Sequence, residues 1–285
     1  MKKTHSILYG LLKEIWENPS NKGQRLYRFF LAILWQFYKR TIKLPLIVKL
    51  DNNMNYVLSP DSSNSTGVIY SKIYEAEYIL FIRKLLSNKK NDVLIDVGAH
   101  SGLFALLIHP LFTESFLFEP AKDNFKLIER NVALNPSLKI KPENVAVSDK
   151  EGFTNFLVTG SHSGTNKIVK DLTKNASNII KVPIISIDSY LRKNGINNAI
   201  SLIKIDTEGH EHGVLKGAEQ TIRNNKEIII LFENSSFDEN YTFLSSLGMN
   251  LFGINKDGSV ISKRDELKHC YNLFALNKQH DFFNL

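Results

Sequence analysis

Three predominantly apolar runs constrain the fold of this chain more than any other feature of its sequence. They are VLIDV at residues 93–97, SLIKI at 201–205 and IIILF at 228–232. Continuous apolar runs of this length are typical of parallel strands that are covered on both faces, because neither face then carries mainly polar side chains. Segments with helical spacing separate these runs, so the sequence predicts a doubly wound α/β sheet.

The expected elements alternate along the chain from residue 93 onward. We expect strands at residues 93–97, 115–118, 139–147, 202–205 and 228–232, and helices at 101–109, 122–134 and 210–224. Two further strands, at 250–254 and 272–276, are expected to close the sheet as an antiparallel pair. The prediction is therefore a mostly parallel sheet of seven strands with helices on both faces.

The first 70 residues differ from the rest of the chain in charge. Residues 1–50 carry ten Lys or Arg residues and two acidic ones, a net charge of +8, whereas the remainder sums to −1. We expect residues 1–70 to form a basic helical and β-hairpin extension and residues 71–285 to form the main domain. The hairpin would pair residues 46–50 with 55–58, followed by a loop at 59–67 and a helix at 74–86. Since the positive charge lies outside the main domain, we expect no nucleic-acid groove there.

The segment from Arg25 to Lys43 has two interpretations that the sequence leaves open. Its apolar stretch, residues 29–35, is too short to span a bilayer. It is either a helix packed on the main domain or an interfacial helix in peripheral contact with an anionic membrane. The single cysteine, Cys270, cannot form an internal disulfide, and no signal peptide is visible. We therefore expect a cytoplasmic protein, either free or peripheral at the inner face of the membrane.

A glycine-containing loop follows the first apolar run, with Asp96 before it and Gly98 and Gly102 within it. Ligands of open α/β sheets bind at the carboxyl ends of the strands, where glycines let the backbone approach closely. The middle glycine of a dinucleotide fingerprint is missing, and Asp96 would repel a pyrophosphate but attract the sulfonium and ammonium groups of S-adenosylmethionine. Glu119, at the end of the next strand, could accept the ribose hydroxyls of either cofactor. The loop thus favours S-adenosylmethionine, with an NAD-dependent oxidoreductase as the alternative.

A second polar cluster follows the strand at residues 202–205 and contains Asp206, Thr207, Glu208, His210 and Glu211. Part of it is expected to cap the next helix, with Thr207 or Asp206 as the N-cap. Capping does not explain His210, because a cation is unfavourable at a helix N-terminus. A neutral His210 is therefore our candidate general base, oriented by Asp206 or Glu208. The alternative is a divalent metal held by Asp206, Glu208 and Glu233.

With both clusters, the chain resembles the FkbM family of methyltransferases. The resemblance covers residues 70–276 and rests on the segments DVGAHSG, FEPAKDNF, ENVAVSDKEG, SIDSYL, LIKIDTEGHEHGVLKGA and LFEN. It implies a Rossmann-like class I methyltransferase fold and transfer of a methyl group from S-adenosylmethionine to an oxygen. Acceptors in the family are often hydroxyls of a sugar or of another natural product, and we expect a polysaccharide or glycolipid here. A non-catalytic, membrane-associated binding protein is the remaining alternative.

The resemblance also implies a role for each matching residue. The methionine part of the cofactor would lie against Asp96, Gly98, Ala99, His100, Ser101 and Gly102. Glu119 would hold the ribose, and the adenine would be flanked by Asn144, Ala146 and Asp149. The sulfonium and the acceptor would lie near Asp206, Glu208 and His210. Weaker candidates are Tyr74 and Glu75, expected on a helix surface, and His162, expected on an exposed loop.

Overall fold

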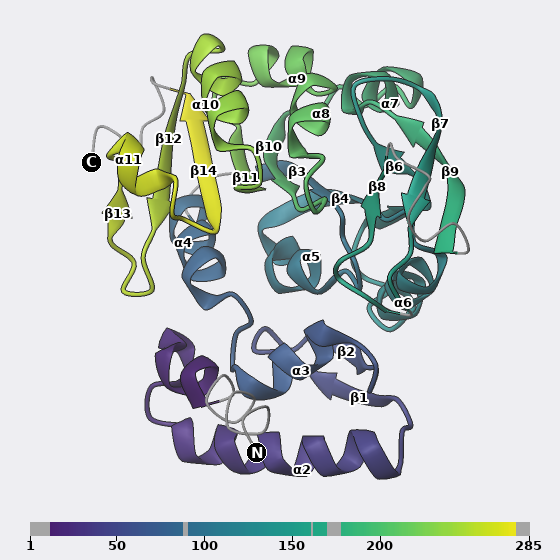
Figure 1. Ribbon diagram of the computed structural model, residues 1–285, viewed down its shortest axis with the longest axis vertical. Helices are drawn as coiled ribbons and strands as arrows, with labels where there is room; N and C mark the ends of the chain where they lie inside the picture. Colours follow the sequence, from purple (N-terminus) through teal and green to yellow (C-terminus); the bar gives the residue numbers. More distant parts are fainter. Residues whose placement is uncertain (1–11, 88–90, 161, 170–177, 278–285) are drawn as a thin grey trace.

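A mostly parallel sheet forms the centre of the computed structural model, which describes residues 12–87, 91–160, 162–169 and 178–277 (Figure 1). Its parallel strands are β3 (Asn91–Val97), β4 (Phe112–Phe118), β5 (Ile140–Glu143), β10 (Ile200–Ile205) and β11 (Ile229–Glu233). Antiparallel pairing adds β14 (Asn272–Asn277), β12 (Met249–Ile254) and β13 (Val260–Ile261). The strand order is β13-β12-β14-β11-β10-β3-β4-β5.

Helices cover both faces of this sheet. One face packs against α4 (Ala76–Leu86), α5 (Leu103–Ile108) and α6 (Lys122–Ala133). The other packs against α7 (Ile187–Lys193), α8 (Glu211–Lys216), α9 (Glu219–Asn224), α10 (Phe237–Ser246) and the short α11 (Arg264–Leu267). Neighbouring strand residues point to opposite faces, so Leu94 joins the first cluster and Ile95 the second. The expected doubly wound α/β fold is confirmed.

The strands differ from the expectation in number and in one boundary. The main sheet has eight strands and not seven, because the connection before β14 forms the two-residue strand β13. The single strand expected at residues 139–147 is wrong: β5 ends at Glu143, and β6 (Ala146–Val147) belongs to a second sheet. The break falls at Asn144, whose side-chain amide donates to the carbonyl oxygen of Glu119 at 2.8 Å. The second sheet also contains β7 (Gly152–Leu157), β8 (Lys167–Ile168) and β9 (Ile179–Ile185), in the order β6-β9-β7-β8.

The helix expected at residues 210–224 consists of two helices, α8 and α9, with Gly217 between them. A Cβ atom at Gly217 would lie 2.0 Å from the carbonyl oxygen of Ser148. The glycine therefore allows close packing against the loop after β6. At the start of α9, the Asp188 carboxylate accepts from the backbone N–H groups of Gln220 and Thr221, both at 2.9 Å. These bonds satisfy donors that the first turn of a helix leaves free.

The N-terminal layer comprises η1 (Pro19–Asn21), α2 (Arg25–Thr41), β1 (Leu46–Lys49), β2 (Asn55–Leu58) and α3 (Ser63–Tyr70). The expected hairpin is confirmed, because β1 and β2 pair antiparallel. The loop expected at residues 59–67 is wrong, since α3 begins inside it. Its Ser and Asn residues are weak helix formers, so tertiary contacts decide. Ser65 Oγ accepts from the N–H of Ser59 at 2.8 Å, and Gly67 packs against the ring of Tyr74.

This layer is joined to the main sheet by polar contacts and by a shared core. The N–H of Val57 donates to Asn131 Oδ1 at 2.8 Å, and the hydroxyls of Tyr56 and Ser101 lie 2.8 Å apart. Trp35 on α2 belongs to the same hydrophobic cluster as α4 and α5. The division into residues 1–70 and 71–285 stays a prediction. No helix in the described part of the chain is long and apolar enough to cross a bilayer.

Candidate active site

A cavity of about 520 Å³ lies at the carboxyl ends of β3, β4 and β10. Several separate parts of the chain line it, among them the loops after these strands, the N-terminal layer around Ser63 and Asn64, and residues 162–168. Among the described residues of its wall, the acids and lysines are Asp61, Glu75, Glu119, Asp206, Glu208 and Lys204. Five carboxylates against one ammonium favour a ligand that carries positive charge.

Gly98 joins the two loops that carry the sequence motifs. Its φ is +78°, and a Cβ atom there would lie 1.8 Å from the carbonyl oxygen of Asp206. Gly98 lines the cavity as expected. The absence of a side chain at Gly98, however, allows the loop after β3 to contact the loop after β10. No other residue could approach that carbonyl so closely.

Lys204 connects the acids at the ends of β3 and β10. It pairs with Asp96 across the two strands, and its Nζ lies 3.7 Å from Asp96 Oδ1 and 3.1 Å from Asp206 Oδ2. Burial alone would lower the pKa of Lys204, but Asp206, Asp96 and Glu75 raise it, so the ammonium stays charged. Asp96 is fully buried behind Lys204, and burial raises its pKa to about 6. No role was predicted for Lys204 from the sequence, although a lysine inside an apolar strand was the available signal.

Glu119 anchors the wall formed by the loop after β4. It is buried, its Oε2 accepts from the N–H of His100 and its Oε1 from the N–H of Ala121, both at 2.8 Å. Burial raises the pKa of Glu119 to about 7. His100 has a left-handed φ of 54°, and its Nε2 lies 3.0 Å from the carbonyl oxygen of His162. The cavity wall thus includes His162, which we expected on an exposed loop.

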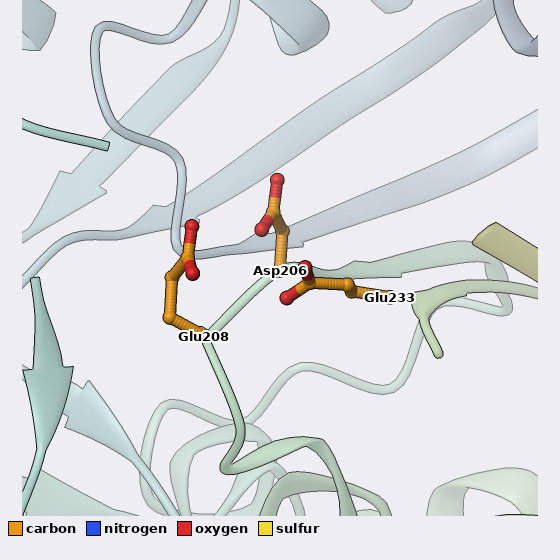
Figure 2. A group of neighbouring side chains, drawn as sticks. All are labelled: Asp206, Glu208 and Glu233. Carbon is orange, nitrogen blue, oxygen red and sulfur yellow. The ribbon is translucent and has the colours of Figure 1, made fainter. Parts of the chain in front are cut away.

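Three carboxylates converge at the ends of β10 and β11. Oxygens of Asp206, Glu208 and Glu233 all lie within 4.8 Å of one another (Figure 2). Burial and then the charge of Asp206 raise the pKa of Glu233 to about 7, and the pKa of Glu208 is raised for the same two reasons. Such a group can hold a divalent cation or accept a proton near neutral pH.

Glu75 adds a further acid that sequence reasoning placed on a helix surface. It precedes α4 with a left-handed φ of 50°, and it lines the cavity. Burial raises the pKa of Glu75 to about 7, partly offset by Lys204. Tyr271, just before β14, also lines the cavity and was not among the sequence candidates. Glu75 was only a weaker candidate and no local motif marks Tyr271, because both reach the cavity through packing of distant segments.

The structure brings some of the sequence candidates to the cavity and leaves others behind it. Its wall contains Gly98, Ala99, His100, Glu119, Ala146, Asp206 and Glu208. The candidates that are not among the lining residues are Asp96, Ser101, Gly102, Asn144, Asp149 and His210. Several of these support the wall: Ser101 bonds Tyr56, and Asn144 bonds the carbonyl oxygen of Glu119.

His210 is not among the residues that line the cavity. Its Nε2 is 2.9 Å from Ser148 Oγ, which in turn donates to Asp149 Oδ1 at 3.0 Å. His210 itself occupies the N-cap position of α8, so the expected N-cap at Thr207 or Asp206 is wrong. The hydrogen-bond donors of this turn are satisfied by the buried carboxylate of Glu211. It accepts from the N–H and the hydroxyl of Thr207 at 3.0 and 2.8 Å. The role of His210 as a base stays a prediction.

Comparison with known proteins supports the resemblance drawn from the motifs. The methyltransferase FkbM domain matches residues 96–252. A hexuronic acid methyltransferase, AglP of Haloferax volcanii, is 26% identical over 188 residues, which are 64% of this chain and 75% of that protein. The crystal structure of methyltransferase FkbM from Methylobacillus flagellatus KT is 15% identical with a TM-score of 0.48. That match covers 70% of this chain and 47% of the other, so this chain spans about half of its length.

A tRNA (uracil-54, C5)-methyltransferase from Pyrococcus abyssi, solved in complex with S-adenosyl-L-homocysteine, is 12% identical with a TM-score of 0.41. The match covers 81% of this chain and 43% of that one. The domain match carries the assignment, because it covers more than half of the chain and includes the loops after β3, β4 and β10 that shape the cavity. This chain belongs to the FkbM family of methyltransferases.

Proposed function

We propose that this chain transfers a methyl group from S-adenosylmethionine to an oxygen atom of a sugar. The observation that carries the cofactor assignment is the charge of the cavity, whose described wall contains five carboxyl groups and one lysine. The sulfonium and ammonium of this cofactor match the carboxylates, and its carboxylate matches Lys204. The pyrophosphate of a dinucleotide would meet repulsion from the same acids. When bound, S-adenosylmethionine would supply an electrophilic methyl group.

The residues of the wall fit this cofactor in detail. Glu119 already accepts two backbone N–H groups and keeps lone pairs for the two ribose hydroxyls. Asn124 lines the cavity beside it, is buried, and has no hydrogen-bond partner for its Oδ1. A buried orphaned acceptor is satisfied by a polar ligand. The apolar side chains of Ala146 and Phe156 offer a surface for the adenine.

The proposal of a sugar acceptor rests on the similarity to a hexuronic acid methyltransferase and on polar side chains of the wall. These side chains come from the N-terminal layer and from the segment before β8: Ser63, Asn64, Ser163, Thr165 and Asn166. Hydroxyl and amide groups can bond a polyhydroxylated acceptor in many orientations. A hydroxyl acceptor has to lose its proton near the transition state, so the site needs a base.

We assign the base to Glu208. It lines the cavity and has a raised pKa, whereas Asp206 is held by the ammonium of Lys204 at 3.1 Å. Burial and then the negative charge of Asp206 raise the pKa of Glu208, so its carboxylate is a better proton acceptor. His210 is the rival base, although its Nε2 faces Ser148. A divalent cation on Asp206, Glu208 and Glu233 is the second rival, and it would act by lowering the pKa of the acceptor hydroxyl.

A carboxylate oxygen of a hexuronic acid is a second acceptor candidate, because the similar protein is named for that sugar. It would need no base. The three carboxylates at the ends of β10 and β11 argue against it, since they would repel an anionic acceptor. The two products differ in chemistry: a methyl ether resists mild alkali, whereas a methyl ester is hydrolysed by it.

The decisive experiment has two stages. Calorimetric titration of the full chain with S-adenosyl-L-homocysteine and with NAD tests the cofactor, and binding of NAD alone would overturn the proposal. Incubation with methyl-labelled S-adenosylmethionine and a panel of neutral and acidic oligosaccharides then tests the acceptor. Alkali-stable label on a sugar oxygen is the expected result. Label on protein, nucleic acid or lipid alone would refute the sugar assignment without touching the methyltransferase assignment.

A further inference from the structure

The outer face of α2 exposes an unusual amount of apolar surface. Leu26, Phe30, Leu34 and Phe37 are 68%, 61%, 63% and 67% exposed, and Ile33 is 48% exposed. Their spacing of three and four residues places them on one stripe of the helix. Figure 1 shows α2 at the edge of the molecule, with α3, β1 and β2 between it and the main sheet.

The stripe is not required for folding, because α2 already has a packed inner face. Ala32 and Trp35 on that face are buried against α3, and Trp35 Nε1 donates to Thr66 Oγ1 at 3.2 Å. After the helix, Ile42, Leu44, Leu46 and Ile47 are exposed as well. We call the five residues of the stripe the docking face. A contiguous exposed apolar surface of this kind marks an interaction site.

The charge around the docking face indicates what covers it. Between Asn18 and Leu50 the sequence has seven Lys or Arg residues and no acid. The exposed members of this set are Lys22, Arg25, Arg40, Lys43 and Lys49. Two copies of the chain meeting through this face would bring their positive charges together. An anionic surface that accepts apolar side chains matches both the charge and the apolar stripe.

We propose that α2 lies flat on an anionic lipid bilayer, with the docking face in the interfacial region. A helix of 17 residues presents about 25 Å of length to such a surface. The apolar stripe would enter the boundary between headgroups and acyl chains, and the lysines and arginines would contact the lipid phosphates. The inner face of α2 stays packed on α3, so docking needs no rearrangement of the cavity. This inference does not depend on the proposed acceptor.

The test is sedimentation of the full chain with vesicles of phosphatidylcholine alone or mixed with phosphatidylglycerol. We expect binding to the anionic vesicles and at least tenfold weaker binding to the neutral ones. The variant Phe30→Ser/Phe37→Ser should lose binding more than tenfold. The matched control Phe153→Ser removes an equally exposed phenylalanine, 66% exposed on β7, and should bind as the wild type does. Arg25→Ser/Lys43→Ser should weaken binding at low salt by about fivefold per residue.

Three results would overturn the inference. The first is equal binding of wild type and Phe30→Ser/Phe37→Ser to anionic vesicles. The second is no vesicle binding by the wild type. The third is a concentration-dependent dimer in sedimentation velocity that the double variant abolishes, which would assign the docking face to a second copy. Methyl transfer to a soluble acceptor should be the same in wild type and double variant, so failure of docking and failure of the proposed activity are separate outcomes.

Discussion

The cavity and the outer face of α2 depart from the usual distribution of side chains in opposite directions. At the cavity, charged groups are buried, and burial raises the pKa values of Glu75, Glu119 and Glu233 to about 7. On α2, large apolar side chains such as Phe37 are exposed to water. Both arrangements cost free energy in the isolated chain. A cationic ligand would relieve the first cost and an apolar, anionic surface the second, which is why each region points to a partner.

The largest expected effect compares the two faces of α2. Trp35→Ala should lower the free energy of unfolding by about 3–5 kcal/mol, because a buried aromatic leaves a cavity. Phe37→Ala, two residues away on the exposed face, should change it by less than ~0.5 kcal/mol. Urea denaturation followed by circular dichroism measures both. Similar decreases in the free energy of unfolding for the two variants would mean that the outer face of α2 is packed as well. The contrast between the two faces would then be wrong.

The next effect concerns the junction of the two strand-end loops. Gly98→Ala should destabilise the fold by about 3 kcal/mol or more, since the new Cβ would collide with the carbonyl oxygen of Asp206. Gly23→Ala is the matched control, because its φ of +83° is similar to the +78° of Gly98 but nothing lies within 4 Å of the added atom. Gly23→Ala should lower the free energy of unfolding by only about 1 kcal/mol, which is the cost of a left-handed backbone conformation for alanine. Thermal unfolding distinguishes steric collision from backbone strain.

A third comparison separates the candidate bases. Glu208→Gln should lower turnover about 10²–10³-fold and leave the affinity for S-adenosyl-L-homocysteine nearly unchanged, since only proton transfer is lost. His210→Gln is the control and should retain most of the turnover, because His210 faces Ser148. The opposite pattern would restore His210 as the base. Loss of activity with a chelator, regained with a divalent cation, would favour the metal alternative on Asp206, Glu208 and Glu233.

The smallest effect is a pH dependence of cofactor affinity. Ribose hydroxyls donate to the ionised form of Glu119, and burial raises its pKa to about 7 in the free protein. Affinity should therefore be highest above pH 7 and fall as the pH drops, by about tenfold between pH 8 and pH 6. Titration calorimetry with S-adenosyl-L-homocysteine measures it. Glu119→Gln should bind more weakly and with a flatter profile, and an unchanged profile in this variant would exclude Glu119 as the titrating group.

Local sequence determined the parallel strands, the two strand-end loops and the family of this chain. VLIDV and SLIKI are apolar enough that any fold must bury them on both faces, and a motif that follows such a strand has to lie at the ligand-binding edge of the sheet. For this reason the sequence alone places Gly98, Glu119, Asp206 and Glu208 at the ligand-binding edge, where the cavity lies.

Tertiary structure alone decided the remaining features. Helix α3 forms from a segment rich in serine and asparagine because Tyr74 and Ser59 hold it, and Asn144 divides one expected strand between two sheets. Glu75 reaches the cavity at the ends of β3 and β10 through helix packing, and the Nε2 of His210 lies against Ser148 Oγ. These outcomes depend on contacts between residues that are distant along the chain, which periodicity and local motifs do not record.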